Sequence, residues 1–73
     1  MNRLGIDVVT EDQSALISAL SDQPEVMSAV SGGTYRMDAS YCQVIVETSW
    51  TEAELEDWLY SYSAAHYVGV FHA

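Results

Sequence analysis

The hydrophobic periodicity of this chain alternates between that of a strand and that of a helix, and this alternation constrains the fold more than any other feature. Residues 2–9, 41–48 and 66–72 alternate apolar with polar or mixed positions, which is typical of β-strands. Residues 11–22 and 52–63 instead repeat their apolar side chains at helical spacing. The chain is therefore expected to run strand, helix, an ambiguous segment, strand, helix, strand.

The start of the first helix carries a capping-box pattern. The Thr10 hydroxyl can accept a hydrogen bond from the Gln13 N–H, while the Gln13 side chain reaches back to the backbone of Thr10. The helix is expected to end near Asp22, because Pro24 disfavours a helical conformation in the residue before it.

The second helix has the clearer start signal. Thr51 and Glu54 form the pattern T-x-x-E, and Trp50 precedes the cap, where it can pack onto Leu55. One apolar stripe then follows along the helix. It consists of Leu55, Trp58, Leu59 and Tyr62. Because this stripe should face a sheet, replacing Leu55 or Trp58 by Ala is expected to destabilise the protein by roughly 2–5 kcal/mol.

The segment 25–30 is ambiguous. It can form a short extra helix at 24–31 or a strand, and its two valines and short length favour the strand. Residues 31–33, Ser-Gly-Gly, are expected to form a turn in either case. Residues 34–37 are then expected to be extended, and 38–40 to form a turn or bulge before the next strand.

This element order, β-α-β-β-α-β, predicts an α+β ferredoxin-like sandwich, with two helices on one face of an antiparallel sheet. Residues 1–73 suffice for one core, so a single small acidic domain is expected. The other face of the sheet then has no cover. Its apolar residues Ile45, Tyr67 and Phe71 are expected to contact a partner or a second copy of the chain.

The order and spacing of these elements resemble those of the ACT and RAM regulatory domains, small ferredoxin-like modules that dimerise and bind amino acids. Pro24-Glu25-Val26, Gly33-Thr34-Tyr35 and the helix before Val68-Gly69-Val70 carry the resemblance. The resemblance implies a regulatory dimer whose open sheet faces pair, with a small molecule at the seam.

The charge balance excludes several kinds of ligand. The chain has 2 Lys or Arg against 11 Asp or Glu, a net charge of −9. Nucleic acids and anionic membranes are bound mainly through cations, so direct binding to either is excluded. Such a chain attracts basic surfaces instead. Acidity also maintains solubility, and that alternative stays open at this point.

The acids crowd the second helix, where they oppose helix formation and have no Lys to relieve them. Carboxylates spaced along a helix can imitate a row of phosphates, and a neighbouring Tyr can stack on Arg. The residues expected to bind a basic partner are Glu52, Glu54, Glu56, Asp57 and Tyr60, with Asp7 and Glu47 as secondary contributors.

The chain has few residues that could act as a nucleophile or bind a metal: one cysteine and two histidines. Cys42 lies on the expected inner face of a strand, where a thiol is usually buried and inert. His66 and His72 share one strand face, but their spacing to Cys42 matches no zinc pattern. No catalysis, cofactor or metal site is therefore expected.

The sequence thus predicts a non-catalytic binding protein. Its size and charge are those of phage inhibitors that block restriction or CRISPR machinery as DNA mimics, which occupy the nucleic-acid-binding surface of a partner. The ACT/RAM-like dimer that binds a small molecule is the alternative. A lone cysteine and the lack of a signal peptide or of an apolar run near the ~20 residues of a membrane helix predict a cytoplasmic protein. The likeness to phage inhibitors implies a bacterial or archaeal cell, with a virus as a source of the gene.

Overall fold

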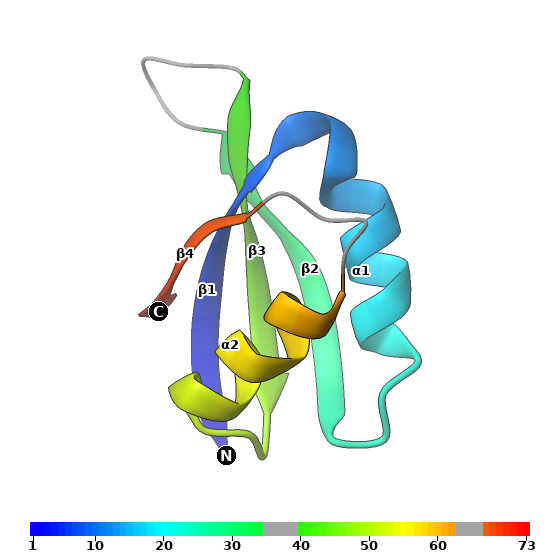
Figure 1. Ribbon diagram of the computed structural model, residues 1–73, viewed down its shortest axis with the longest axis vertical. Coiled ribbons are helices and arrows are strands. Elements are labelled where there is room, and N and C mark those ends of the chain that lie inside the picture. Colours follow the sequence, from blue (N-terminus) through cyan, green and yellow to red (C-terminus); the bar gives the residue numbers. More distant parts are fainter. Residues whose placement is uncertain (35–39, 63–66) are drawn as a thin grey trace.

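The computed structural model describes residues 1–34, 40–62 and 67–73 (Figure 1). The elements follow the expected order, and the ambiguous third segment is a strand. They are β1 (Asn2–Val9), a short 3-10 helix η1 (Thr10–Asp12), α1 (Gln13–Ser21), β2 (Val26–Thr34), β3 (Tyr41–Thr48), α2 (Glu52–Ser61) and β4 (Tyr67–His72). Of the expected turn at 38–40, only Ser40 lies within the described residues, and it is in a turn.

The four strands form one sheet in the order β2-β3-β1-β4, with every neighbouring pair antiparallel. Both helices lie over the same face of this sheet, α1 beside β2 and α2 across the lower part of the sheet (Figure 1). This small α+β architecture is consistent with a ferredoxin-like fold. Neither helix in the described part of the chain has the length and apolarity needed to cross a membrane.

The core lies between the sheet and the helices. On β1 and β3 the inner positions are those expected from the two-residue alternation, and Cys42 is among them, only 1% exposed. On β2 the expected alternation of Val26, Ser28 and Val30 is wrong, because a register shift between Val26 and Ser28 leaves Ala29 buried and Val30 exposed. The buried set is Leu4, Ile6, Val8, Leu16, Leu20, Val26, Ala29, Cys42, Val44, Val46, Leu55 and Leu59. The other face of the sheet therefore carries the remaining strand side chains.

The capping box expected at Thr10 and Gln13 does not form, so that prediction is wrong. The turn of 3-10 helix places Gln13 at the first position of α1, after Asp12, which makes no side-chain capping bond. The Gln13 side-chain amide instead donates to the Ser31 hydroxyl and to the Gln43 carbonyl, both at 2.9 Å. This tertiary contact ties the start of α1 to β2 and β3.

The turn expected at Ser31-Gly32-Gly33 is also absent, because β2 continues through these residues to Thr34. The pairing with β3 shifts register between Ser31 and Gly33, and Gly33 has a φ of +100°. A β-bulge absorbs the extra residue, and glycine accepts the positive φ without a steric penalty. The glycine pair therefore forms a bulge in β2, and the pairing with β3 continues on both sides of it.

Thr48 fixes the entry to α2 from inside the core. This fully buried residue ends β3, and its hydroxyl donates to the Glu25 carbonyl at 2.8 Å. The same oxygen accepts from the Trp50 N–H at 3.1 Å. Because a buried hydroxyl needs partners, this residue joins the start of β2, the end of β3 and the segment that leads into α2.

Candidate functional site

The first turn of α2 uses one of its acids for structure. The Glu54 N–H donates to the Thr51 hydroxyl at 3.2 Å, and the Thr51 N–H donates to the Glu54 carboxylate at 3.0 Å. This is the capping box that the sequence predicted. Glu54 is therefore exposed but already engaged, and its charge also suits the positive end of the helix dipole.

A second acid of α2 faces the last strand. The Glu52 carboxylate lies 3.0 Å from Nε2 of His72 in β4, and both side chains are accessible to solvent. The contact becomes an ion pair when His72 is protonated, and such exposed pairs stabilise proteins only slightly. It holds the start of α2 near the end of β4.

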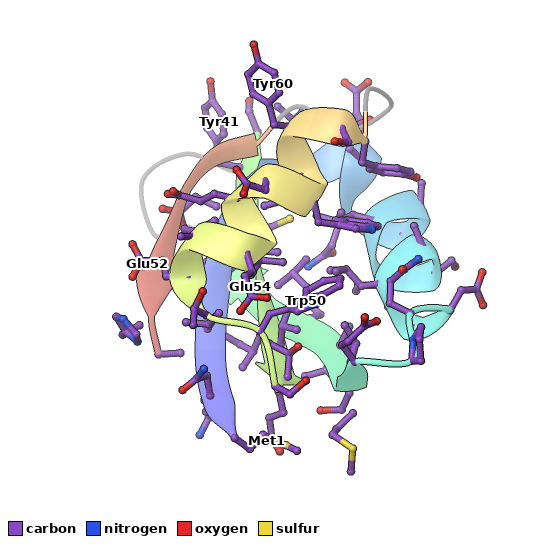
Figure 2. The ribbon with its side chains drawn as sticks, turned by 60° about the horizontal axis from the view of Figure 1, so that its bottom comes forward. Met1, Tyr41, Trp50, Glu52, Glu54 and Tyr60 are labelled. Atoms are coloured by element: carbon purple, nitrogen blue, oxygen red, sulfur yellow. The ribbon has the colours of Figure 1, made fainter. Side chains whose placement is uncertain are left out.

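The next two acids of α2 have no such partner. Glu56 and Asp57 are exposed, and their carboxylates form no hydrogen bond or ion pair with any described residue. Tyr60, 86% exposed, lies four and three positions further along the helix, so its ring and the two carboxylates are surface neighbours. Figure 2 shows Tyr60 pointing away from the ribbon, at the opposite end of α2 from Glu52 and Glu54.

The inner side of α2 is anchored by aromatic rings. The Trp58 ring stacks on Tyr62 with centroids 5.0 Å apart, and the Trp50 ring lies 6.1 Å from Trp58. The Tyr62 hydroxyl donates to the Ala15 carbonyl of α1 at 3.5 Å. These contacts, with the buried Leu55 and Leu59, hold the helix so that its acidic side faces outward.

Most acidic residues of the protein lie on the helix side of the sheet. Eight of the 11 acidic residues lie in the helices and in the connection from α1 to β2, where the described chain has no Lys or Arg. They are Glu11, Asp12, Asp22, Glu25, Glu52, Glu54, Glu56 and Asp57. The helix layer is therefore the strongly negative side of the molecule.

Asp7 and Glu47, expected to support α2 in binding, lie on the other side of the sheet. Their strand neighbours Ile6 and Val46 point into the core, and successive side chains of a strand point to opposite faces. The structure therefore brings Glu52, Glu54, Glu56, Asp57 and Tyr60 together on α2 but separates Asp7 and Glu47 from them.

The open sheet face carries an apolar row across all four strands. In the pairing register, Val30 lies opposite Ile45, Ile45 opposite Gly5, and Gly5 opposite Phe71. The ring of Phe71 rests over Gly5, since a Cβ built there would lie 2.1 Å from its Cζ. Phe71 and Ile45 are partly exposed. The side chain of Tyr67 lies outside the described part.

The buried carboxylate oxygen of Asp7 is a site feature that sequence patterns did not reveal. The Oδ1 atom of this residue is buried, and it has no hydrogen-bond partner in the part of the chain that the structure describes. The two residues opposite it on the neighbouring strands are Gln43 and Gly69. A buried, unpaired carboxylate oxygen requires an explanation, and nothing in the local sequence signals it.

The described residues form no pocket, and they contain no group of three His, Cys, Asp or Glu placed to hold a metal ion. No protein-family model, curated protein or solved structure matches the chain. The candidate site is thus defined by surface chemistry: the acidic α2 on one layer and the open sheet face on the other.

Proposed function

We propose that this chain, built as a ferredoxin-like sandwich, is a non-catalytic protein that binds a basic surface of a partner protein through the exposed side of α2. The segregation of eight acids into the helix layer, with no cation among the described residues there, carries the proposal. Solubility requires charge but does not require charges of one sign on one layer.

The exposed group Glu56, Asp57 and Tyr60 suits arginine. A carboxylate can take two hydrogen bonds from one guanidinium group, and an exposed tyrosine ring can stack on its plane. Both acids are free of intramolecular bonds in the described chain, so binding would not first break an ion pair. This group forms the centre of the proposed contact.

Glu52 extends the contact toward the start of the helix. Four residues of helix rise by about 6 Å, close to the axial rise of roughly 6.8 Å over two nucleotides of one DNA strand. Glu52 and Glu56 therefore repeat at a spacing that cations arranged for phosphates can meet. On this basis the preferred partner is a nucleic-acid-binding protein, and the chain would inhibit it by occupying its nucleic-acid site.

A protein of this type works where nucleic-acid-processing machinery is present. The proposal therefore includes the cytoplasm of a bacterial or archaeal cell, with a phage as a source of the gene. Long-range attraction between the acidic layer and a basic partner should act mainly on the association rate.

The test compares two variants of equal charge. Glu56→Gln/Asp57→Asn changes the centre of the contact, while Glu11→Gln/Glu25→Gln neutralises two exposed acids elsewhere. Association with an immobilised arginine-rich peptide is measured between 50 and 300 mM salt, a range over which the Debye length falls from about 14 Å to about 6 Å.

We expect the parent rate to fall steeply with salt, and the α2 variant to associate at least about tenfold more slowly than the control variant. The parent should also displace duplex DNA from a basic DNA-binding domain. Equal association rates for the two variants would show that only the net charge matters and not its position on α2, and this result would overturn the proposal.

A further inference from the structure

The open sheet face has a charge pattern of its own along β1. Three successive outward positions are Arg3, Gly5 and Asp7. Arg3 is exposed and is the only Lys or Arg among the described residues, where it forms no ion pair. Asp7 has the buried, unpaired Oδ1. An unused cation and an unused carboxylate therefore lie on one face, with a glycine between them.

These two charges flank the apolar row symmetrically. Two residues of antiparallel strand advance about 6.8 Å, so Arg3 and Asp7 lie at similar distances on either side of Gly5. On β3, Glu47 lies opposite Arg3, Ile45 opposite Gly5, and Gln43 opposite Asp7. The face thus has three rows that run across the strands. The middle row is apolar, the row on one side of it contains Arg3, and the row on the other side contains Asp7.

We infer that this face binds a second copy of the chain, sheet against sheet, about a two-fold axis that runs along the apolar row. Such an axis reverses the strand direction but keeps β1 over β1. Arg3 then lies over the partner's Asp7, and Asp7 lies over the partner's Arg3. The pairing places a cationic donor beside the partly exposed Asp7 side chain in each half of the interface.

The remaining positions are compatible with the same axis. Glu47 meets the partner's Gln43, whose amide can donate to a carboxylate, so no two like charges face each other. Val30, Ile45 and Phe71 meet their own copies along the axis. A basic partner would instead bring cations against Arg3, and for that reason a second copy fits this face better.

The acidic layer does not oppose this arrangement strongly. The helices lie on the opposite side of each sheet, so face-to-face packing places the two negative layers on the outside (Figure 1). They are then separated by two sheets about 10 Å apart, more than a Debye length at physiological salt. The two α2 surfaces stay accessible, and the dimer does not depend on the function proposed for them.

The expected dimer is a weak one. Four strands, each about 4.8 Å wide, and seven residues of about 3.4 Å each give a flat area near 450 Å² per copy. Side-chain relief adds to this area, but the interface stays at the low end of the range for specific complexes. The dissociation constant should therefore be micromolar rather than nanomolar.

Sedimentation equilibrium of the full chain tests the pairing by charge exchange. Arg3→Asp and Asp7→Arg should each weaken the dimer about tenfold or more, and the double variant Arg3→Asp/Asp7→Arg should restore it to within about threefold of the parent. Exchanging Arg3 with its in-sheet neighbour, Arg3→Asp/Glu47→Arg, is the control and should not restore it.

A second pair of variants avoids the buried position. Val30→Glu places a charge in the apolar row at a residue that is 54% exposed, and it should abolish the dimer. Met27→Glu lies on the same strand, is 68% exposed and has no partner in the register, so it should leave the dimer intact.

A parent chain that stays monomeric up to about 1 mM would overturn the inference. Rescue by the Arg3–Glu47 exchange, or equal effects of Val30→Glu and Met27→Glu in folded proteins, would also overturn it. None of these outcomes involves the arginine-rich peptide, so the dimer and the function proposed for α2 can fail separately.

Discussion

Replacing Thr48 by Val should destabilise the protein although the two side chains have nearly the same shape. The hydroxyl of this buried residue donates to the Glu25 carbonyl and accepts from the Trp50 N–H. Valine fills the space but can do neither. The free energy of unfolding should therefore fall because two hydrogen bonds are lost inside the protein.

The size of this loss in the free energy of unfolding depends on the hydrogen bonds that remain to the Glu25 carbonyl and the Trp50 N–H in the Val variant. The Glu25 carbonyl still accepts from the Ser49 N–H at 3.1 Å, so it stays satisfied. The Trp50 N–H has no second acceptor among the described residues. In the Val variant this N–H group is therefore left without a hydrogen bond, and the free-energy cost of removing it from water is not compensated. At roughly 1 kcal/mol per bond the loss is about 2 kcal/mol. For a domain of this size that lowers Tm by roughly 8–16 °C.

Thr48→Ser is the matched control, because it keeps the hydroxyl and removes only a methyl group. Removing one buried methyl group costs about 1 kcal/mol. Guanidinium unfolding, followed by tryptophan fluorescence, should thus rank the parent above the Ser variant and the Ser variant above the Val variant. A Val variant as stable as the parent, or more stable than the Ser variant, would show that the hydroxyl does not hold this junction.

Three further substitutions test the structure elsewhere. Leu55→Ala, at a fully buried position, should lower the free energy of unfolding by roughly 2–5 kcal/mol, and an unchanged denaturant midpoint would contradict the packing of α2. Thr51→Ala removes the N-cap and should cost about 1 kcal/mol, seen as lower helical circular dichroism on mild heating. Gly5→Ala should cost roughly 1–3 kcal/mol because its Cβ displaces the Phe71 ring; a double-mutant cycle with Phe71→Leu should remove most of that cost, and additivity would argue against the contact.

The predictions that the structure confirms depend on near neighbours along the chain. The alternation in 41–48 identified β3 and its inner face, since Cys42, Val44 and Val46 are all buried. The Thr51–Glu54 box located the start of α2, because its two hydrogen bonds join residues only three apart. Such signals need no knowledge of the rest of the fold.

The predictions that failed depend on distant partners. Gln13 does not close a capping box, because its side chain bonds β2 and β3, and one of these acceptors lies 30 residues away. Ser31-Gly32-Gly33 forms no turn, because hydrogen bonding to β3 outweighs the local preference of a glycine pair. In both cases a tertiary contact overrides a valid local signal.

The same division applies to the candidate surfaces. The sequence by itself determined the net charge of −9, the crowding of carboxylates on one helix and the apolar inner faces, because composition and periodicity are properties of the chain. Strand alternation also placed Asp7 and Glu47 on the open face. Only the tertiary structure decided that Val30, Ile45, Gly5 and Phe71 form one row across that face, with Arg3 and Asp7 on either side of it. Strand pairing sets these relations, and it joins residues as distant as Gly5 and Phe71, which are 66 positions apart and whose register no local pattern records.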